Sequence, residues 1–258
     1  MAIRLKTPEQ IERMRKAGRI VRQVLTSLGE MIAPGLTTEE LDRQAERICL
    51  EAGGTCLFKN YPGRDGAGPF PGSICASIDQ EVVHGIPSRR RVIAEGQIVS
   101  IDFGVQRDGW CADAAQTFVV GTVPAATRRL VEVTRNALAM TISMLRPGRF
   151  WSEVVRVTQD YIESEGFRIV RQYVGHGIGQ EMHEDPKVPN FVSRELLVRD
   201  IRLEPGLVLA VEPMVNLGTA ETRCLADGWT VVTRDGKPSA HFEHTLAITE
   251  DGVSVLTD

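Results

Sequence analysis

The chain repeats a pattern of two amphipathic helices, and this repeat limits its possible folds more than any other feature. In the first half, one helix ends at Pro34-Gly35 and the next ends at Gly53-Gly54. The same order returns in the second half, with Pro147-Gly148 after one helical stretch and Gly166 after the next. Both pairs of matching turns have the same separation along the chain, which is not expected from chance matches among common turn signals.

Each helix pair is followed by a buried strand that leads to an acid. The segments at 96–102 and 206–212 both run from a glycine through aliphatic residues to a carboxylate, and Asp-Gly-Trp follows each of them. A helix-helix-strand unit that occurs twice predicts two pseudo-twofold related halves, at about 1–121 and 122–258, with a site between them.

Composition and charge are those of an ordinary globular protein. Of the 258 residues, 42% are hydrophobic and 25% are charged, with a formal net charge of -4, which gives ample apolar material for a core. The length fits one large domain over 1–258 or two fused halves. Basic and acidic residues are mixed, so we expect no nucleic-acid ligand. No run reaches the ~20 apolar residues that span a bilayer, and no signal-peptide core is present. These features predict a cytoplasmic protein without membrane contact.

Four acids occupy strand-like positions where a lone carboxylate is unfavourable. Asp102 closes an apolar run, where burial without a partner is costly. Asp113 follows the turn Asp108-Gly109, so a hairpin would place the two acids side by side. Glu212 ends the matching strand of the second half, and Glu243 lies in a further strand-like run. An ion pair or a solvated strand end stays open for any one of them, but adjacent carboxylates repel and shared cations would relieve that repulsion.

Each of the five histidines lies in a glycine-rich turn or a strand, and His176 and His183 are the candidates for this site. His176, in Gly-His-Gly-Ile-Gly, has backbone room on both sides, which suits an imidazole that reaches a ligand from a turn. His183 follows a few residues later and could face the same cavity. A lone histidine in a turn is more often structural, so the hypothesis depends on the whole set.

Four carboxylates and one neutral imidazole carry four negative charges, which two divalent cations would balance. Oxygen-rich ligands with a single nitrogen favour Mn, Fe, Co or Zn. Two ions ~3.5–4 Å apart can bridge one water, lower its pKa from about 15.7 toward ~7 and polarise the carbonyl that it attacks. A nearby carboxylate then takes and returns the proton. The set therefore predicts a hydrolytic site.

Signatures of other site types are missing. The five cysteines form no CxxC pair, which argues against a disulfide framework and a thiolate zinc site. The motifs HExxH, GxSxG, GxxxxGK[ST] and GxGxxG after a strand are absent as well. His183-Glu184 begins like a zinc-protease motif, but Pro186 would end a helix there. Zincin, serine hydrolase and nucleotide-dependent functions are therefore excluded.

Short strings around these residues identify a family. They are VVHGIP at 82–87, SIDFGV at 100–105, WCADAAQTF at 110–118, GHGIG at 175–179, HEDP at 183–186, VEPMVN at 211–216, DGWTVVT at 227–233 and EHT at 243–245. With them the chain closely resembles the type I methionine aminopeptidases in their short bacterial form, over nearly its whole length. The short interval between His176 and Glu212 leaves no room for the helical insertion of the type II enzymes.

The resemblance implies an α+β fold of the pita-bread (creatinase/aminopeptidase) type, with a curved antiparallel sheet covered by helices. It implies that Asp102 and Asp113 bind one metal ion, that His176 and Glu212 bind the other, and that Asp113 and Glu243 bridge both. The activity that it implies is metal-dependent removal of the N-terminal methionine from polypeptides with a small second residue, with a metal-bridged water as the nucleophile. The two divalent ions would be Co, Mn, Fe or Zn.

Further roles follow from the resemblance alone. Glu212 would also carry the proton, His84 would contact the scissile amide nitrogen, and His183 would polarise the carbonyl oxygen. Soft and aromatic groups suit a thioether. The residues expected around the methionine side chain are Tyr61, Phe70, Cys75, Met182 and Trp229.

The implied partners are the N-termini of nascent proteins, with transient contact to the ribosome, and we expect a monomer. Two alternatives stay open. An Xaa-Pro aminopeptidase or dipeptidase of the same fold would share the five ligands but usually carries a separate N-terminal domain, whereas the first helix here begins near Thr7. A non-catalytic pita-bread binding protein should have lost ligands, and this chain retains all five. The Gly/Pro-rich loop at 61–72 is expected to act as a lid or pocket wall.

Overall fold

The computed structural model describes residues 3–63 and 66–258, and its long helices lie where the repeat predicts them. Arg64 and Asp65 of the loop predicted at 61–72 lie outside the described residues. One short helix, α5, follows no signal that the repeat provides. The helices are α1 (Pro8–Met31), α2 (Thr38–Glu51), α3 (Ala125–Met144), α4 (Trp151–Ser164) and α5 (Arg194–Val198).

Both helices of the first pair begin at capping boxes. The Thr7 hydroxyl accepts a hydrogen bond from the backbone N–H of Gln10 at 3.3 Å, and the Gln10 side chain accepts one from the N–H of Thr7 at 3.0 Å. Thr37 and Glu40 repeat this arrangement at the start of α2. Helix α3 instead begins after Pro124 without a side-chain cap. The local sequence therefore determines where the first two helices start, whereas α3 depends more on packing.

The strands pair antiparallel in all the ladders of the described residues and form four sheets. One sheet has the order β1-β4-β2 with β5 on β4, two have the orders β13-β10-β6 and β11-β12-β3, and the largest has the order β15-β14-β9-β7-β8. The strands are β1 (Thr55–Cys56), β2 (Cys75–Ile78), β3 (Glu81–Val83), β4 (Ile98–Arg107), β5 (Trp110–Val119), β6 (Arg168–Ile169), β7 (Gly175–Gly177), β8 (Glu184–Val188), β9 (Val208–Val211), β10 (Met214–Asn216), β11 (Thr222–Cys224), β12 (Val231–Thr233), β13 (Ser239–His241), β14 (His244–Thr249) and β15 (Gly252–Val255).

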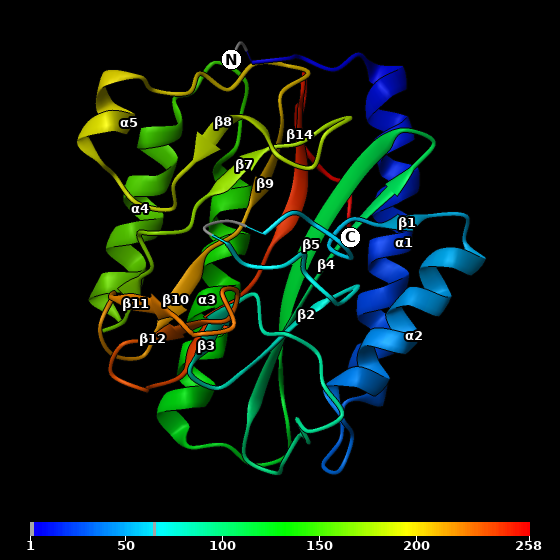
Figure 1. Cartoon of the computed structure of the whole chain (residues 1–258). Coiled ribbons are helices and arrows are strands. Elements are labelled where there is room, and N and C mark those ends of the chain that lie inside the picture. Colours follow the sequence, from blue (N-terminus) through cyan, green and yellow to red (C-terminus); the bar gives the residue numbers. More distant parts are fainter. Residues whose placement is uncertain (1–2, 64–65) are drawn as a thin grey trace.

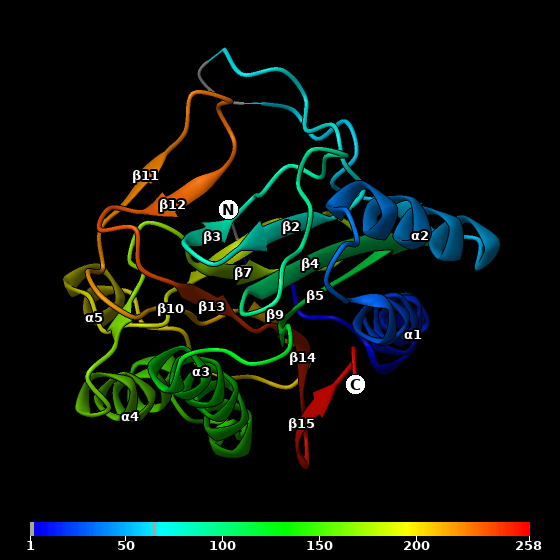
Figure 2. The same cartoon turned by 90° about the horizontal axis from the view of Figure 1, so that it is seen from below.

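The two helix pairs pack against the strands on two sides of the molecule (Figures 1 and 2). Helices α1 and α2 lie beside β4 and β5, and α3 and α4 lie on the opposite side of the molecule. Each helix pair buries its own apolar cluster. Val21 and Leu28 of α1 pack with Phe103 of β4, and Leu130 of α3 and Trp151 of α4 belong to a second cluster. Burial of these side chains stabilises the two sides separately, at about 25 cal/mol per Å² of apolar surface.

Threonine hydroxyls connect the strands of the two halves. The Thr117 hydroxyl donates to the carbonyl oxygen of His241 at 2.8 Å and accepts from its backbone N–H at 2.9 Å. The Thr245 hydroxyl makes the same pair of bonds with the backbone of Asp113, at 2.8 and 2.9 Å. These bonds hold β5 against β13 and β14, so the position of Asp113 relative to the second half is set by backbone contacts.

Two expectations about cellular context concern the helices and the cysteines. Among the described residues, no helix has the length and apolar character needed to cross a membrane. All five cysteines are free thiols, with Cys49, Cys75 and Cys111 buried.

Candidate metal centre

Asp102 and Asp113 lie on the β4–β5 hairpin, as the sequence predicts. The two-residue turn Asp108-Gly109 has φ angles of 51° and 77°, which fit the hairpin turn that Asp-Gly favours. The register places the two acids two positions apart across the ladder, on the same face of the sheet. One detail of the prediction is wrong: Asp102 does not end its strand, because β5 continues the ladder and extends β4 to Arg107.

His176 lies on strand β7 and not in a turn, so that part of the prediction is wrong as well. A Cβ atom on Gly175 would lie 2.3 Å from the carbonyl oxygen of Ala210, and one on Gly177 would lie 2.2 Å from that of Asp185. The glycines therefore permit neighbouring strands to approach closely. The Nδ1 atom of His176 donates to the carbonyl oxygen of Gly177 at 2.9 Å, which leaves Nε2 as the ligand atom.

Glu212 and Glu243 both lie where a strand stops. Glu212 follows β9 directly, and the Asn190 side-chain amide donates to its carbonyl oxygen at 3.0 Å. Glu243 occupies the break between β13 and β14, so the single strand expected there is interrupted. Its backbone N–H donates to the carbonyl oxygen of Ala115 at 2.9 Å. That bond aims Glu243 at the face of β5 that carries Asp113.

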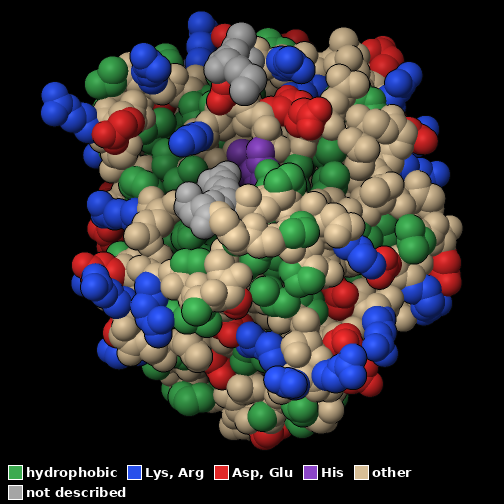
Figure 3. All heavy atoms as spheres, in the orientation of Figure 1, with side chains coloured by type: hydrophobic (Ala, Val, Ile, Leu, Met, Phe, Trp, Pro, Cys, Tyr) green, Lys and Arg blue, Asp and Glu red, His purple; other side chains and the backbone are tan. Residues whose placement is uncertain are grey.

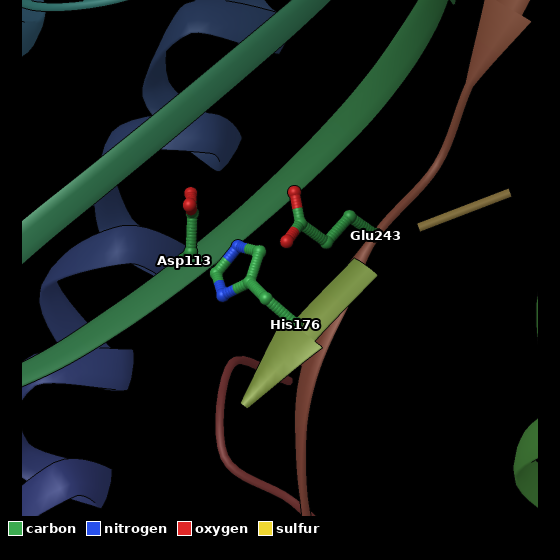
Figure 4. Close-up of side chains that lie close together, drawn as sticks. All are labelled: Asp113, His176 and Glu243. Atoms are coloured by element: carbon green, nitrogen blue, oxygen red, sulfur yellow. The ribbon is translucent and has the colours of Figure 1, made fainter. Parts of the chain in front are cut away.

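The five predicted ligands, named here the five-residue cluster, lie together in one cavity. Ligand atoms of Asp113, His176 and Glu243 all lie within 4.8 Å of one another. Figure 4 shows these three side chains pointing toward each other from β5, β7 and the segment before β14. The Nε2 atom of His176 lies 3.7 Å from Oε1 of Glu212. Asp102 lines the same cavity as the other four residues.

The five-residue cluster leaves several buried oxygens without partners. Within the described part of the chain, Oδ1 of Asp102, Oδ1 of Asp113 and Oε1 of Glu243 are buried and accept no hydrogen bond. An orphaned buried carboxylate oxygen is strongly unfavourable. Four acids around one imidazole Nε2 are the donor set of a divalent cation site. The residues present therefore fit a metal centre better than a network of hydrogen bonds.

The acids of the cluster hold their protons more tightly than usual when no cation is near. Burial raises the pKa of Asp113 to about 7, and burial together with the charge of Asp113 raises the pKa of Glu212 to about 8. Burial and neighbouring acids raise the pKa of Asp102 and of Glu243 well above the usual range. Burial, then the nearby His183, lowers the pKa of His176 to about 3, so its imidazole is neutral. Bound cations would stabilise the deprotonated carboxylates and so lower these pKa values.

The cluster lines one side of a cavity of about 1170 Å³. In Figure 3, a histidine side chain is visible in a hollow near the middle of the molecular face, close to acidic side chains. Predicted residues His84 and His183 also line this cavity. The ring of His183 lies 4.3 Å from that of His176, and its Nδ1 lies 2.9 Å from the Tyr61 hydroxyl. His84 has a φ of 60° and faces the rings of Tyr173 and Trp229.

The five residues predicted to surround the methionine side chain, named here the side pocket, form one apolar group beside the cluster. Phe70 and Cys75 are buried, and the partly buried Tyr61, Met182 and Trp229 pack against them. The rings of Phe70 and Trp229 meet edge to face with centroids 5.2 Å apart. The Trp229 indole N–H donates to the carbonyl oxygen of Gly68 at 2.9 Å, which joins the loop at 66–72 to the β11–β12 hairpin.

Sequence reasoning missed two features of the site. His241 is 1% exposed and faces the acids of the cluster, although only its nearness to Glu243 in the chain could have pointed to it.

The second feature is an ion pair. The ammonium of Lys6 lies 2.7 Å from the carboxylate of Glu184, and both side chains are less than a tenth exposed. Glu184 also accepts from the N–H groups of Gln180 and Glu181. No local signal links Lys6 to this loop, which carries Met182 and His183.

Comparisons with known proteins agree on one family. The sequence model of metallopeptidase family M24 matches residues 12–250. The chain is 46% identical to "Methionine aminopeptidase 1" of Bacillus subtilis (strain 168) over 252 residues, which cover 98% of each chain. The crystal structure of methionine aminopeptidase from Thermotoga maritima covers 100% of both chains with a TM-score of 0.93 at 40% identity.

A more distant structure has the same fold with an extra part. The Xaa-Pro dipeptidase from Bacillus anthracis matches with a TM-score of 0.75 at 23% identity, and the match covers 98% of this chain but 62% of that one. The similarity at this level concerns the fold, which is the predicted pita-bread type of helix-covered antiparallel strands. The remaining part of the dipeptidase has no counterpart in the residues of this chain.

Proposed function

The chain belongs to metallopeptidase family M24 and, within it, to the methionine aminopeptidases, and from this premise we propose that it removes the N-terminal methionine from polypeptides by metal-dependent hydrolysis. The observation that carries this proposal is the five-residue cluster. Its buried carboxylate oxygens accept no hydrogen bonds within the described residues, and the neutral Nε2 of His176 faces them. Oxygen and nitrogen donors arranged in this way are suited to bind divalent cations, which would occupy the unpaired acceptor atoms.

The cluster would hold two divalent ions. Asp102 and Asp113 would bind one, His176 and Glu212 the other, with Asp113 and Glu243 shared between them. When bound, the ions supply Lewis acidity and a nucleophile that forms at neutral pH. The donor set accepts Mn, Fe, Co or Zn, and availability would select among them.

The remaining roles fall to residues around the cluster. Glu212, whose Oε1 lies 3.7 Å from Nε2 of His176, would take a proton from the attacking water and pass it to the leaving amine. His183, which the Tyr61 hydroxyl orients through Nδ1, would donate to the carbonyl oxygen of the scissile bond. His84 would contact the amide nitrogen of that bond. All three side chains line the same cavity, which supports a shared role in peptide-bond cleavage.

The side pocket would receive the methionine side chain. Its rings and the thiol of Cys75 offer a soft apolar environment, which suits a thioether. We further propose that the enzyme prefers a small second residue in its substrate and that it is a monomer. We also propose a cytoplasmic location and transient contact with the ribosome, where nascent N-termini emerge. The family supports these finer points, and the single catalytic domain with two related halves is proposed on the same basis.

The test is cleavage of two short peptides by chelator-stripped protein titrated with Mn, Co, Fe or Zn. We expect metal-dependent release of methionine from Met-Ala-Ser and no cleavage of an Ala-Pro peptide. A matched control is the Glu204→Gln variant. Glu204 is an exposed acid that lies shortly before β9, whereas Glu212 directly follows that strand.

Other outcomes would redirect the proposal. Cleavage of the Ala-Pro peptide alone would assign the chain to the Xaa-Pro peptidases, whose fold it shares. No cleavage of either peptide with any of the metals would indicate a binding protein without catalysis. Equal loss of activity in the Glu204→Gln control would show that charge removal anywhere disturbs the enzyme.

A further inference from the structure

His241 is the polar side chain of the site that the proposed function leaves without a role. It lies on β13, two residues before Glu243, and its backbone is fixed by two hydrogen bonds to the Thr117 hydroxyl. The side chain is 2% exposed, so it contacts protein and not solvent. Its Nε2 atom is buried and has no hydrogen-bond partner among the described residues. A polar atom in that position is unfavourable unless something completes its hydrogen bonding.

The geometry around Nε2 identifies the missing partner. It lies 3.7 Å from Oε2 of Glu212 and 4.0 Å from Oε2 of Glu243. On the other side of the same carboxylate, Nε2 of His176 lies 3.7 Å from Oε1 of Glu212. Glu212 therefore lies between two imidazoles, with one oxygen toward each. Carboxylate oxygens only accept, so the nitrogen of His241 that faces them must carry the hydrogen.

We propose that His241 is a positioning residue whose Nε2–H donates to the outer oxygen of Glu212 and so holds the inner oxygen toward His176 and the bound cations. The inference rests on the proposed metal centre and adds a residue to it. A carboxylate with both oxygens free can rotate, whereas one with a fixed outer oxygen presents its inner oxygen in a single direction. A shift of about 0.5–1 Å brings the observed separation into hydrogen-bonding range. Groups that orient ligands in this way strengthen metal binding.

The test compares metal affinity in three chelator-stripped proteins, titrated with Mn²⁺ by calorimetry. In His241→Leu the donor is gone, and we expect Mn²⁺ binding to weaken by about 10–100-fold. In His241→Gln the amide N–H₂ replaces the donor, and we expect most of the affinity to return. The control is His244→Gln, since His244 pairs with the Thr257 hydroxyl at 2.9 Å, away from the acids. We expect its affinity to match that of the unaltered protein.

Two results would overturn the inference. One is unchanged Mn²⁺ affinity in His241→Leu, and the other is equal weakening in His241→Leu and His241→Gln, which would show a packing role. If the unaltered protein itself binds no Mn²⁺, the proposed function fails and not only the role of His241. Melting temperatures of the metal-free proteins establish that each variant is folded.

A second measurement needs no variant at all. In ¹⁵N-histidine-labelled protein loaded with Zn²⁺, long-range nitrogen–proton spectra report which ring nitrogen carries hydrogen. We expect His241 to be protonated on Nε2 and His176 on Nδ1, because their partners are a carboxylate and a carbonyl oxygen. A hydrogen-free Nε2 on His241 would overturn the inference even if every variant fails to fold.

Discussion

The five-residue cluster and the side pocket line the same cavity but are built in different ways. Cluster residues lie in strands or directly at strand ends, where ladders and threonine bonds fix the backbone. The side pocket takes Cys75 from strand β2, but it draws Tyr61 and Phe70 from a loop, Met182 from another loop and Trp229 from a hairpin turn. Its segments are joined by contacts such as the single indole bond to Gly68.

The difference reflects what each region must do. Like charges in a buried cluster repel, so only a stiff backbone can hold them close enough to share cations. An apolar side chain is bound by contact area, which tolerates small movements of the surrounding rings. We therefore expect substitutions in the cluster to affect turnover, and those in the side pocket to affect substrate affinity.

The largest effect is expected for Glu212→Gln. The amide keeps the shape of the side chain but cannot take a proton and is a weaker ligand. We expect kcat on Met-Ala-Ser to fall by at least about 10²–10⁴-fold, the range for loss of a general acid–base group. Stopped assays of methionine release at saturating metal would measure it, with thermal melting as the check that the fold persists.

The exposed Glu204→Gln should retain full turnover, which separates a general charge effect from a local one. Activity of Glu212→Gln close to that of the unaltered protein would refute the proton-carrying role. It would also weaken the contrast between the two regions, because the cluster would then tolerate a change at its centre.

The same contrast explains how far the sequence could predict this molecule. The helix starts at Thr7 and Thr37 and the turn at Asp108-Gly109 depend on neighbours in the chain, and the structure agrees with each. The apolar run predicts that Asp102 ends a strand, which is wrong because the length of β4 depends on its pairing with β5. His176 was assigned to a turn because glycines usually mark turns, whereas here they allow close strand packing.

Long-range contacts account for what was missed. The contact of His241 with Glu212 joins segments far apart in the chain, and so does the bond between Lys6 and Glu184. Nothing in the local pattern around Lys6 distinguishes this buried lysine from a lysine at the surface. The candidate ligands could be named because acids on apolar strands need partners, whereas the residues that orient them follow no such pattern.

An intermediate effect concerns the stability of the metal-free protein as the pH rises. The ordinary pKa values are 3.8 for Asp and 4.5 for Glu, and burial raises them to about 7 in Asp113 and about 8 in Glu212. The folded chain thus binds protons that the unfolded chain has lost, so stability falls as the pH rises from the ordinary pKa values to the raised ones, and these two groups contribute no further change above that range. His176 and His241 oppose this trend only below their ordinary pKa of 6.5. We expect the melting temperature to fall between about pH 6.5 and about pH 8.

Calorimetry on chelator-stripped protein would measure this fall. The Glu212→Gln variant should show a shallower decline, because one of the titrating groups is gone, and the Glu204→Gln variant should not. Protein loaded with Mn²⁺ should gain stability over the same range, since cation binding requires the deprotonated ligands. A metal-free melting temperature that rises between about pH 6.5 and about pH 8 would contradict the assignment of raised pKa values to the cluster.

The smallest effect is expected for Trp229→Leu in the side pocket. The substitution removes the ring that meets Phe70 and the bond to Gly68, but no group that faces the scissile bond. Contacts with the methionine side chain are made equally before and during the reaction, so their loss should raise KM with little change in kcat. We expect KM for Met-Ala-Ser to rise about 10-fold, roughly 1.4 kcal/mol, within the range for aromatic contacts.

Trp229→Phe keeps a ring while losing the indole bond, so a smaller rise in Trp229→Phe would assign the effect to ring contact. A kcat loss in Trp229→Leu as large as that in Glu212→Gln would break the division between the two regions, because it would mean that the loop at 66–72 also positions the cluster.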